Sequence, residues 1–248
     1  MLSKSQLSLV KSLHQKKYRK ENHLFFVEGV KAVTEFLNSG FSLHSIYTVS
    51  ELVSKLPNLS HKQKVFEVSI NELEKISALQ SPQGVLAVFE IPKEKGFDMD
   101  KVDDLVIVLD GVQDPGNMGT IIRTADWFGF KKMVCSKDTV EIYNPKVVQA
   151  SMGSLARVTV SYLDLDTLFA NNALPVYGTL LNGDNIFGYN FSEKGFLVFG
   201  NEGKGISEEI KGFINKAVTI PGGTNTESLN VSISAAICCA EVRRNMFK

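Results

Sequence analysis

One stretch decides the fold class: it reads LVIVLDGVQDPGNMGTIIRTADWF and runs from Leu105 to Phe128. Its first five residues are all branched and apolar, which is typical of a strand covered on both faces. A loop of Gly, Asp and Pro follows, and residues 118–128 have a helical pattern. This succession predicts an α/β fold with a mostly parallel sheet, in which ligands bind beyond the carboxyl ends of the strands.

The rest of the C-terminal half continues the alternation of strands and helices. Strands are predicted near Met133 and at 158–160, 176–179, 196–199 and 217–220, and helices at 145–152, 164–171, 206–213 and 229–246. The helix over 229–246 is apolar nearly all round, so we expect it to be buried in a core or at an interface.

The first ninety residues predict a smaller α/β domain. Helical patterns are found at 5–19, 29–38, 50–56 and 70–78, and short strands at 25–27, 46–49, 65–68 and 85–89. Residues 91–104 carry Pro92, Gly96 and many charges but little periodicity, which is typical of a linker. The predicted division is a small domain over 1–90, a linker over 91–104 and a second domain over 105–248.

The chain has 248 residues, with 27 basic and 27 acidic side chains, so its formal net charge is zero. This balance excludes a polycation and does not exclude nucleic-acid binding, which depends on where the charge lies. Six of the first twenty residues are basic and none is acidic. We therefore expect the N-terminal domain to supply most of any affinity for nucleic acid.

The numbers and positions of the cysteines and histidines limit the kinds of chemical site that the chain can form. Three cysteines, two of them adjacent, predict neither a disulfide framework nor a zinc site. All four histidines precede residue 62, which excludes a histidine-based site in the second domain. The apolar runs are too short to span a membrane and the N-terminus lacks an apolar signal segment. We expect a cytoplasmic protein with no metal and no membrane partner.

Three loops of the second domain combine Gly, Asn and acidic residues: 109–123, 198–207 and 220–230. Each alone is explained as a turn, Asn117 as a helix N-cap and Arg123 as a solvated helix residue. None matches a dinucleotide or P-loop motif. Because all three follow predicted strands, we expect them to assemble one site.

These loops resemble the three motifs of the SpoU/TrmH family of RNA ribose 2′-O-methyltransferases, within the SPOUT superfamily. The first motif matches Asp114–Gly119 through Arg123, the second Phe199–Gly205, and the third Ile220-Pro221 with Glu227–Asn230. The resemblance spans roughly 105–245. The segment from Lys16 through Gly29 resembles the ribosomal-protein-like substrate-binding domain that precedes many such catalytic domains.

The resemblance implies a trefoil-knotted catalytic domain, S-adenosylmethionine as methyl donor and a homodimer through the C-terminal domain. The implied cofactor-binding residues are Thr179, Leu180, Gly200, Ile220 and Leu229. The implied catalytic residues are Arg123, Asn117, Glu202, Ser228 and Asn230. The residues expected to contact RNA phosphates are Lys16, Lys17, Arg19 and Lys20; a solvated helix face is the alternative explanation for them.

The resemblance also implies roles for these residues. A guanidinium, with a pKa above about 12, is a poor base, so we expect Arg123 to clamp an RNA phosphate and stabilise the oxyanion. Asn117 is expected to orient Arg123 or the ribose, and Glu202 to act in catalysis or to brace its loop. Large-subunit ribosomal RNA is the expected substrate. The alternatives are a transfer RNA methyltransferase and a non-catalytic RNA-binding or ribosome-assembly protein of the same fold.

Overall fold

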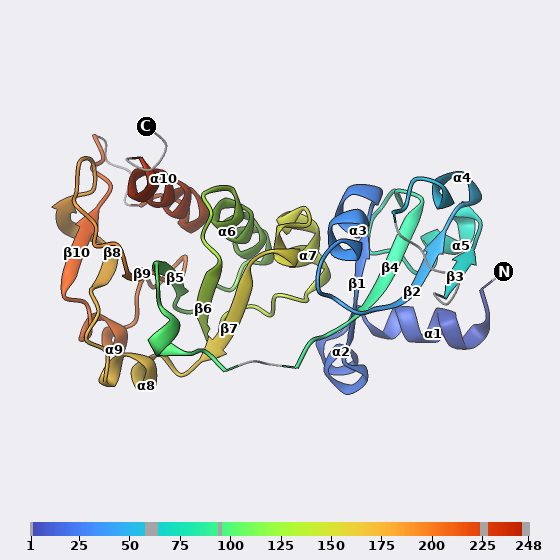
Figure 1. Cartoon of the computed structure of the whole chain (residues 1–248), viewed down its shortest axis with the longest axis horizontal. Coiled ribbons are helices and arrows are strands. Elements are labelled where there is room, and N and C mark those ends of the chain that lie inside the picture. The colour runs from blue at the N-terminus through green and yellow to red at the C-terminus, as the bar shows by residue number, and fades with distance from the viewer. Residues whose placement is uncertain (1, 58–63, 94–95, 224–227, 245–248) are drawn as a thin grey trace. The chain divides into compact units, whose positions relative to one another are not determined.

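The computed structural model describes residues 2–57, 64–93, 96–223 and 228–244 (Figure 1). Its contacts divide the chain into two compact units. Unit 1 comprises Met1–Lys93 and Glu141–Arg157, and unit 2 comprises Glu94–Val140 and Val158–Lys248. The segment Glu141–Arg157 therefore packs with the N-terminal residues, which differs from the expected placement of all residues after 105 in one domain.

Unit 1 is a four-stranded sheet with helices on both faces. Its elements are α1 (Lys4–Ser12), α2 (Lys16–Asn22), β1 (Leu24–Glu28), α3 (Val30–Leu37), β2 (Leu43–Thr48), α4 (Ser50–Val53), β3 (Val65–Glu67), α5 (Ile70–Glu74), β4 (Val85–Glu90), α7 (Pro145–Ser151) and the 3₁₀ helix η2 (Ser154–Ala156). The strand order is β1-β4-β2-β3, and only β2 and β3 are parallel.

Two apolar clusters hold unit 1 together. On one face, Val10 and Leu13 pack with Leu73 and Phe26. On the other, the ring of Phe25 contacts the rings of Phe36, Phe89 and Tyr143. Phe25 and Phe26 are both buried, which confirms that these rings belong to the core and are not free to stack on bases.

The expected helix over 5–19 is two helices, α1 and α2, with an extended residue, Gln15, between them. The guanidinium of Arg19 donates hydrogen bonds to the carbonyl oxygens of Leu13 (2.8 Å) and His14 (3.0 Å). These carbonyls lie where α1 ends and lack a helical donor, so Arg19 stabilises the break. The sequence carries no Gly or Pro that would have predicted it.

Unit 2 contains a six-stranded sheet. Its elements are η1 (Met99–Lys101), β5 (Leu105–Leu109), α6 (Pro115–Trp127), β6 (Lys132–Ser136), β7 (Thr159–Leu163), α8 (Leu165–Ala170), β8 (Val176–Asn185), β9 (Gly195–Phe199), α9 (Glu208–Lys211), β10 (Lys216–Thr219) and α10 (Val231–Arg243). The strand order is β10-β8-β9-β5-β6-β7 and every pair is parallel. This confirms the predicted α/β fold with a parallel sheet.

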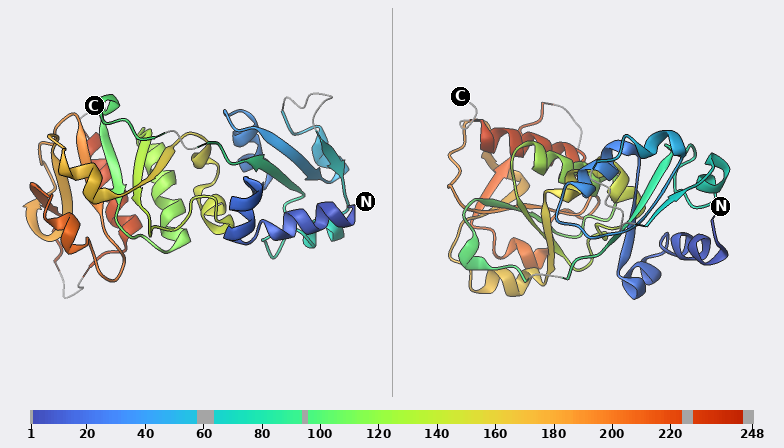
Figure 2. Two further views of the ribbon diagram at one scale, coloured as in Figure 1. Left: turned by 90° about the horizontal axis from the view of Figure 1, so that it is seen from below. Right: turned by 45° about the vertical axis from the view of Figure 1, so that its right-hand side comes forward.

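The side chains of β5 alternate between two layers. Val106 and Val108 pack with Phe169 of α8 and Ile210 of α9. On the opposite face, α6 and α10 pack side by side, as the right-hand view of Figure 2 shows. Buried apolar residues on both faces explain why the strand reads as an unbroken apolar run.

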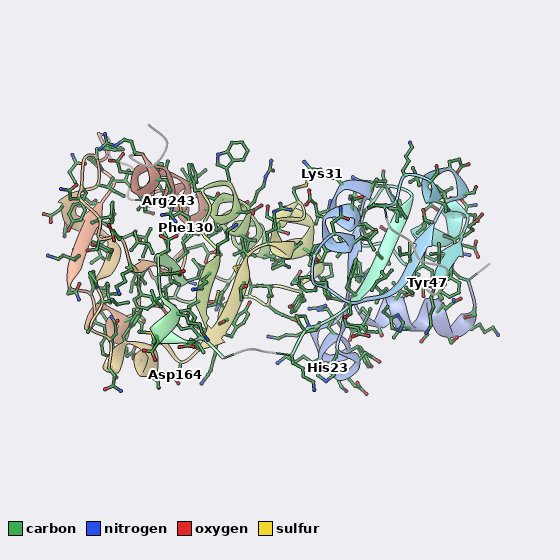
Figure 3. The ribbon with its side chains drawn as sticks, viewed as in Figure 1. His23, Lys31, Tyr47, Phe130, Asp164 and Arg243 are labelled. Atoms are coloured by element: carbon green, nitrogen blue, oxygen red, sulfur yellow. The ribbon has the colours of Figure 1, made fainter. Side chains whose placement is uncertain are left out.

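The helix α10 is anchored at its C-terminal end by a buried cation. Arg243 forms an ion pair with Asp104, which precedes β5, and donates to the carbonyl oxygen of Phe128. Its guanidinium also lies over the ring of Phe130, 4.0 Å from the centroid (Figure 3). Part of α10 is buried in the core, as predicted, while Ile233 is half exposed in the single chain; burial of that face at an interface stays a prediction.

The three cysteines are buried, reduced side chains. Burial raises the pKa of Cys238 to about 12 and also raises the pKa of Cys135 and Cys239. They therefore pack as small apolar residues. Among the described residues, no helix has the length and apolar character needed to cross a membrane.

Candidate active site

The three loops singled out in the sequence follow three of four consecutive strands in the sheet of unit 2. The first loop follows β5, the second follows β9 and the third follows β10, with β8 lying between β9 and β10. Because all these strands are parallel, their carboxyl ends lie at one edge of the sheet, the edge at which α/β proteins bind ligands.

The first loop ends in a capped helix. The carboxylate of Asp114 accepts a hydrogen bond from the backbone nitrogen of Asn117 at 2.8 Å, and Pro115 opens the helix. The N-cap of α6 is therefore Asp114, and the interpretation of Asn117 as the cap was wrong. The helix begins earlier than predicted because proline is well tolerated in the first turn. The side chain of Asn117 is thereby left available for contacts outside its own helix.

Glu202 joins the second loop to the first. Its carboxylate accepts hydrogen bonds from the backbone nitrogens of Gln113 (3.4 Å) and Asp114 (3.2 Å) and from Nδ2 of Asn117 (3.0 Å). Partial burial disfavours the charged form, but these hydrogen bonds outweigh it and lower the pKa of Glu202 below its usual value. Glu202 is therefore an ionised brace between the two loops.

Asn230 joins the third loop to the same group. It is the N-cap of α10, accepting from the backbone nitrogen of Ser232 at 2.9 Å. Its Nδ2 donates to Oδ1 of Asn117 at 3.0 Å. The structure thus brings together Asn117, Glu202 and Asn230, which are up to 113 residues apart in sequence.

Arg123 and Ser228 stand outside this hydrogen-bonded group. Arg123 is exposed on α6, and neither it nor the exposed Ser228 forms a hydrogen bond or ion pair with another described residue. The carboxamide of Asn117 bonds to Glu202 and Asn230, and no bond joins it to Arg123 among the described residues, so its expected role in orienting Arg123 or the ribose stays a prediction. Glu227 of the third motif lies outside the described residues.

The implied cofactor-binding residues cluster at the same edge of the sheet. Thr179 and Leu180 lie on β8, while Gly200 and Ile220 directly follow β9 and β10. All four are half-buried, and Oγ1 of Thr179 donates to the carbonyl oxygen of Val198 at 2.9 Å. Leu229, which directly precedes the N-cap of α10, is 48% exposed. These half-buried residues follow the last β8–β9 pair, Gly178 with Val198, or directly follow β9 and β10, and their side chains are small or apolar, which suits a nucleoside ligand.

Gly200 is a glycine for a steric reason. A Cβ at this position would lie 2.1 Å from the backbone carbon of Gly205 and the backbone nitrogen of Ile206. Gly200 therefore allows the loop to fold back on itself, closed by paired backbone hydrogen bonds of 2.9 Å between Asn201 and Gly205.

Two further residues of the site were not predicted. Nδ2 of Asn201 donates to the carbonyl oxygen of Gly111 at 2.7 Å, and the buried carboxylate of Asp110 accepts from the backbone nitrogen of Ser207 at 2.7 Å. Asn201 lies in the second motif, and Asp110 lies in the first loop, before the first motif begins. In sequence, however, an Asn before Glu-Gly has the pattern of an ordinary turn, and its partner lies 90 residues away.

The residues expected to bind RNA lie on α2 of unit 1, where one expectation is corrected. Lys16, Lys17 and Lys20 are exposed. Arg19 is 2% exposed and forms an ion pair with Glu141 at 2.7 Å, so its guanidinium is not available to an RNA phosphate. A fully partnered, buried cation is a structural group.

Two known protein-family models match most of the chain. Residues 104–240 match the model of the SpoU rRNA Methylase family, and residues 4–87 match the MRM3-like substrate binding domain. The 23S rRNA (guanosine(2553)-2′-O)-methyltransferase RlmP of Bacillus subtilis is 33% identical over 239 residues, which cover 94% of each chain.

Solved structures agree with this match. A TrmH-family protein from Porphyromonas gingivalis has 38% identity and a TM-score of 0.90, with 99% of each chain covered. The S-adenosylmethionine-bound rRNA methyltransferase from Sinorhizobium meliloti has 26% identity and a TM-score of 0.87, covering 100% of this chain and 97% of the other. On this evidence the chain belongs to the SpoU rRNA methylase family.

Proposed function

We propose that this protein methylates the 2′-hydroxyl of a ribose in ribosomal RNA, with S-adenosylmethionine as the methyl donor. The observation that carries the proposal is the joining of Asn117, Glu202 and Asn230, one from each motif, beside the strand ends that hold the implied cofactor-binding residues. When bound, S-adenosylmethionine supplies an electrophilic methyl group carried on a sulfonium ion.

The residues of the chain contribute mainly by positioning. Methyl transfer requires the ribose oxygen to lie in line with the methyl group, and such alignment supplies a large part of a rate enhancement. The hydrogen-bonded group of Asn117, Glu202 and Asn230 fixes the first and third loops relative to the second. Since the Glu202 carboxylate already accepts three hydrogen bonds, we assign it to bracing the site.

Arg123 is the group assigned to the substrate. Its guanidinium is exposed and unpaired among the described residues, so it is available to bind the phosphate next to the target ribose. A cation at that position also stabilises the negative charge that develops as the 2′-hydroxyl loses its proton. Lys16, Lys17 and Lys20 add sequence-independent contacts to phosphates.

Ribosomal RNA is favoured over transfer RNA by how far the relatives match. The B. subtilis enzyme, whose name gives 23S rRNA, aligns with 94% of the chain, including the N-terminal unit. The Aquifex aeolicus protein described as a tRNA-modifying enzyme covers only 58% of it. We also propose a cytoplasmic location.

We also propose a homodimer through the C-terminal domain. Trp127 on α6 is 81% exposed, and Ile233 on the adjacent α10 is 50% exposed. Exposed apolar side chains on two neighbouring helices are typical of an interface. Sedimentation velocity of Trp127→Glu should show a monomer, whereas Ile70→Glu, which changes an exposed apolar residue of unit 1, should remain a dimer. A monomeric wild-type protein would contradict the proposal.

The central experiment measures methyl transfer and cofactor binding separately. Purified protein should bind S-adenosylmethionine in calorimetry and transfer its methyl group to large-subunit ribosomal RNA. Arg123→Ala should lose methyl transfer while retaining cofactor affinity, and Lys131→Ala, a control for an exposed cation near α6, should change neither.

If the wild-type protein binds no S-adenosylmethionine, the proposed enzymatic activity is refuted and a non-catalytic RNA-binding protein is favoured. Transfer to tRNA alone would favour the alternative substrate. Ribose methylation mapped in cells with and without the protein would identify the nucleotide.

A further inference from the structure

We propose that Asn201 is a positioning residue, which sets where Gly200 and Glu202 stand relative to the first loop. This inference rests on the proposed function for its catalytic meaning. The geometry that supports it is confined to unit 2.

The Asn201 carboxamide makes three hydrogen bonds. Nδ2 donates to the carbonyl oxygen of Gly111 in the first loop at 2.7 Å. Oδ1 accepts from the backbone nitrogens of Gly203 at 2.9 Å and Lys204 at 3.0 Å, within its own loop. One side chain therefore closes the second loop and also fastens it to the first.

The peptide that Asn201 holds is itself fixed from its other side. The backbone nitrogen of Gly111 donates to Oγ of Ser136 at 2.8 Å, and Gly111 has a φ of +72°, in the region that favours glycine. The neighbouring Asp110 carboxylate accepts from the backbone nitrogen of Ser207. Residues 110 and 111 thus hold the second loop near both its ends, at 201 and at 207.

This arrangement makes the neighbours of Asn201 depend on it. Gly200 and Glu202 directly precede and follow Asn201, and Glu202 reaches the first loop from the turn that Asn201 closes. The bonds from Glu202 to the first loop are longer, at 3.0–3.4 Å, than the 2.7 Å bond from Asn201. We therefore infer that Asn201 sets the distance between the first and second loops, and that Glu202 stabilises the two loops at that distance.

The test compares Asn201 with an asparagine that makes similar bonds elsewhere in unit 2. Asn172 donates from Nδ2 to the carbonyl oxygen of Leu174 at 2.7 Å and accepts from the backbone nitrogen of Leu174 at 2.9 Å, beyond α8. Asn201→Ala and Asn172→Ala remove the same type of local bracing. Asn201→Asp keeps the two acceptor bonds but replaces the donor that faces the Gly111 carbonyl, so it isolates the link between the loops.

Three readouts are expected to separate the variants. In calorimetry, Asn201→Ala and Asn201→Asp should weaken S-adenosylmethionine binding about tenfold, the effect of losing one well-formed hydrogen bond, and Asn172→Ala should leave it unchanged. In the cofactor-free protein, the chemical shift of the Glu202 carboxyl carbon should report a pKa below the ordinary value of 4.5. In Asn201→Ala, the pKa of Glu202 should move up toward that value. Amide exchange at Gly203 and Lys204 should accelerate in Asn201→Ala and not in Asn172→Ala.

The proposal is overturned if Asn201→Ala, folded as judged by circular dichroism, keeps the wild-type Glu202 titration and binds the cofactor within twofold of wild type. A wild-type protein that binds no S-adenosylmethionine would instead refute the proposed function. The titration and exchange measurements need no cofactor, so they would still decide the role of Asn201.

Discussion

Replacing Gly200 with alanine offers a quantitative test of how tightly the second loop is built. The added Cβ would lie 2.1 Å from backbone atoms of Gly205 and Ile206, whereas ordinary contacts begin at 3.4 Å. The two strands of the turn must therefore separate by about 1.3 Å, because backbone cannot rotate away as a side chain can. A misplacement of about 1 Å in a catalytic constellation costs on the order of 100-fold in rate. We expect kcat/KM of Gly200→Ala to fall by about that factor.

The assay is methyl transfer to ribosomal RNA with calorimetry of S-adenosylmethionine binding in parallel. Gly203→Ala is the matched control, because the same methyl group there would meet nothing closer than 3.7 Å and the backbone is not in the left-handed region. It should remain within threefold of wild type. If Gly200→Ala is as active as Gly203→Ala, the turn accommodates a methyl group at position 200, and the steric explanation for Gly200 is wrong.

Three further predictions concern other parts of the molecule. Glu141→Ala should lower the free energy of unfolding by about 3 kcal/mol in denaturant titration, since it leaves the buried Arg19 without its ion-pair partner. Glu208→Ala, which breaks an exposed ion pair, should lower it by less than about 1 kcal/mol. Equal effects would contradict a structural role for the buried ion pair. Replacing Lys16, Lys17 and Lys20 with serine should reduce the slope of log affinity for RNA against log salt by about 2. The matched control replaces Lys55, Lys64 and Lys75 with serine. An unchanged slope, or an equal loss in the control, would show that α2 presents an ordinary solvated face. The three cysteines should resist a thiol reagent at pH 8 until the protein unfolds, because burial keeps them protonated; rapid labelling of the native protein would show that they are accessible.

The local sequence predicted most of the architecture. The apolar run Leu105–Leu109 specified a strand covered on both faces, and the parallel sheet and its helices follow as expected. The loops after β5, β9 and β10 were identified as one site because their composition recurs at strand ends. Element boundaries were less accurate: α6 begins at Pro115 because Asp114 caps the helix three residues before Asn117 and proline is well suited to the first helical position. The knotted path implied by the family resemblance stays a prediction.

Charge patterning in the first twenty residues was a weaker guide. It identified a basic segment, and it placed Arg19 with the lysines because nothing in the local sequence distinguishes them. Only the packing of Glu141, 122 residues away, shows that Arg19 is structural. For the same reason, deletion of the whole segment would remove Val10, Leu13 and Arg19 from unit 1 and would not report on RNA binding alone.

The sequence by itself determined the alternation of elements, the chemistry of the three loops and the family to which they belong. These properties depend on residue periodicity and on the types of side chain near strand ends, which are local. Only the tertiary structure decided which partners meet: Glu202 with Asn117, Asn117 with Asn230, Asn201 with Gly111 and Arg19 with Glu141. Each of these pairs joins residues at least 85 positions apart, and such pairings depend on how the strands order themselves in the sheet and on which segments pack together.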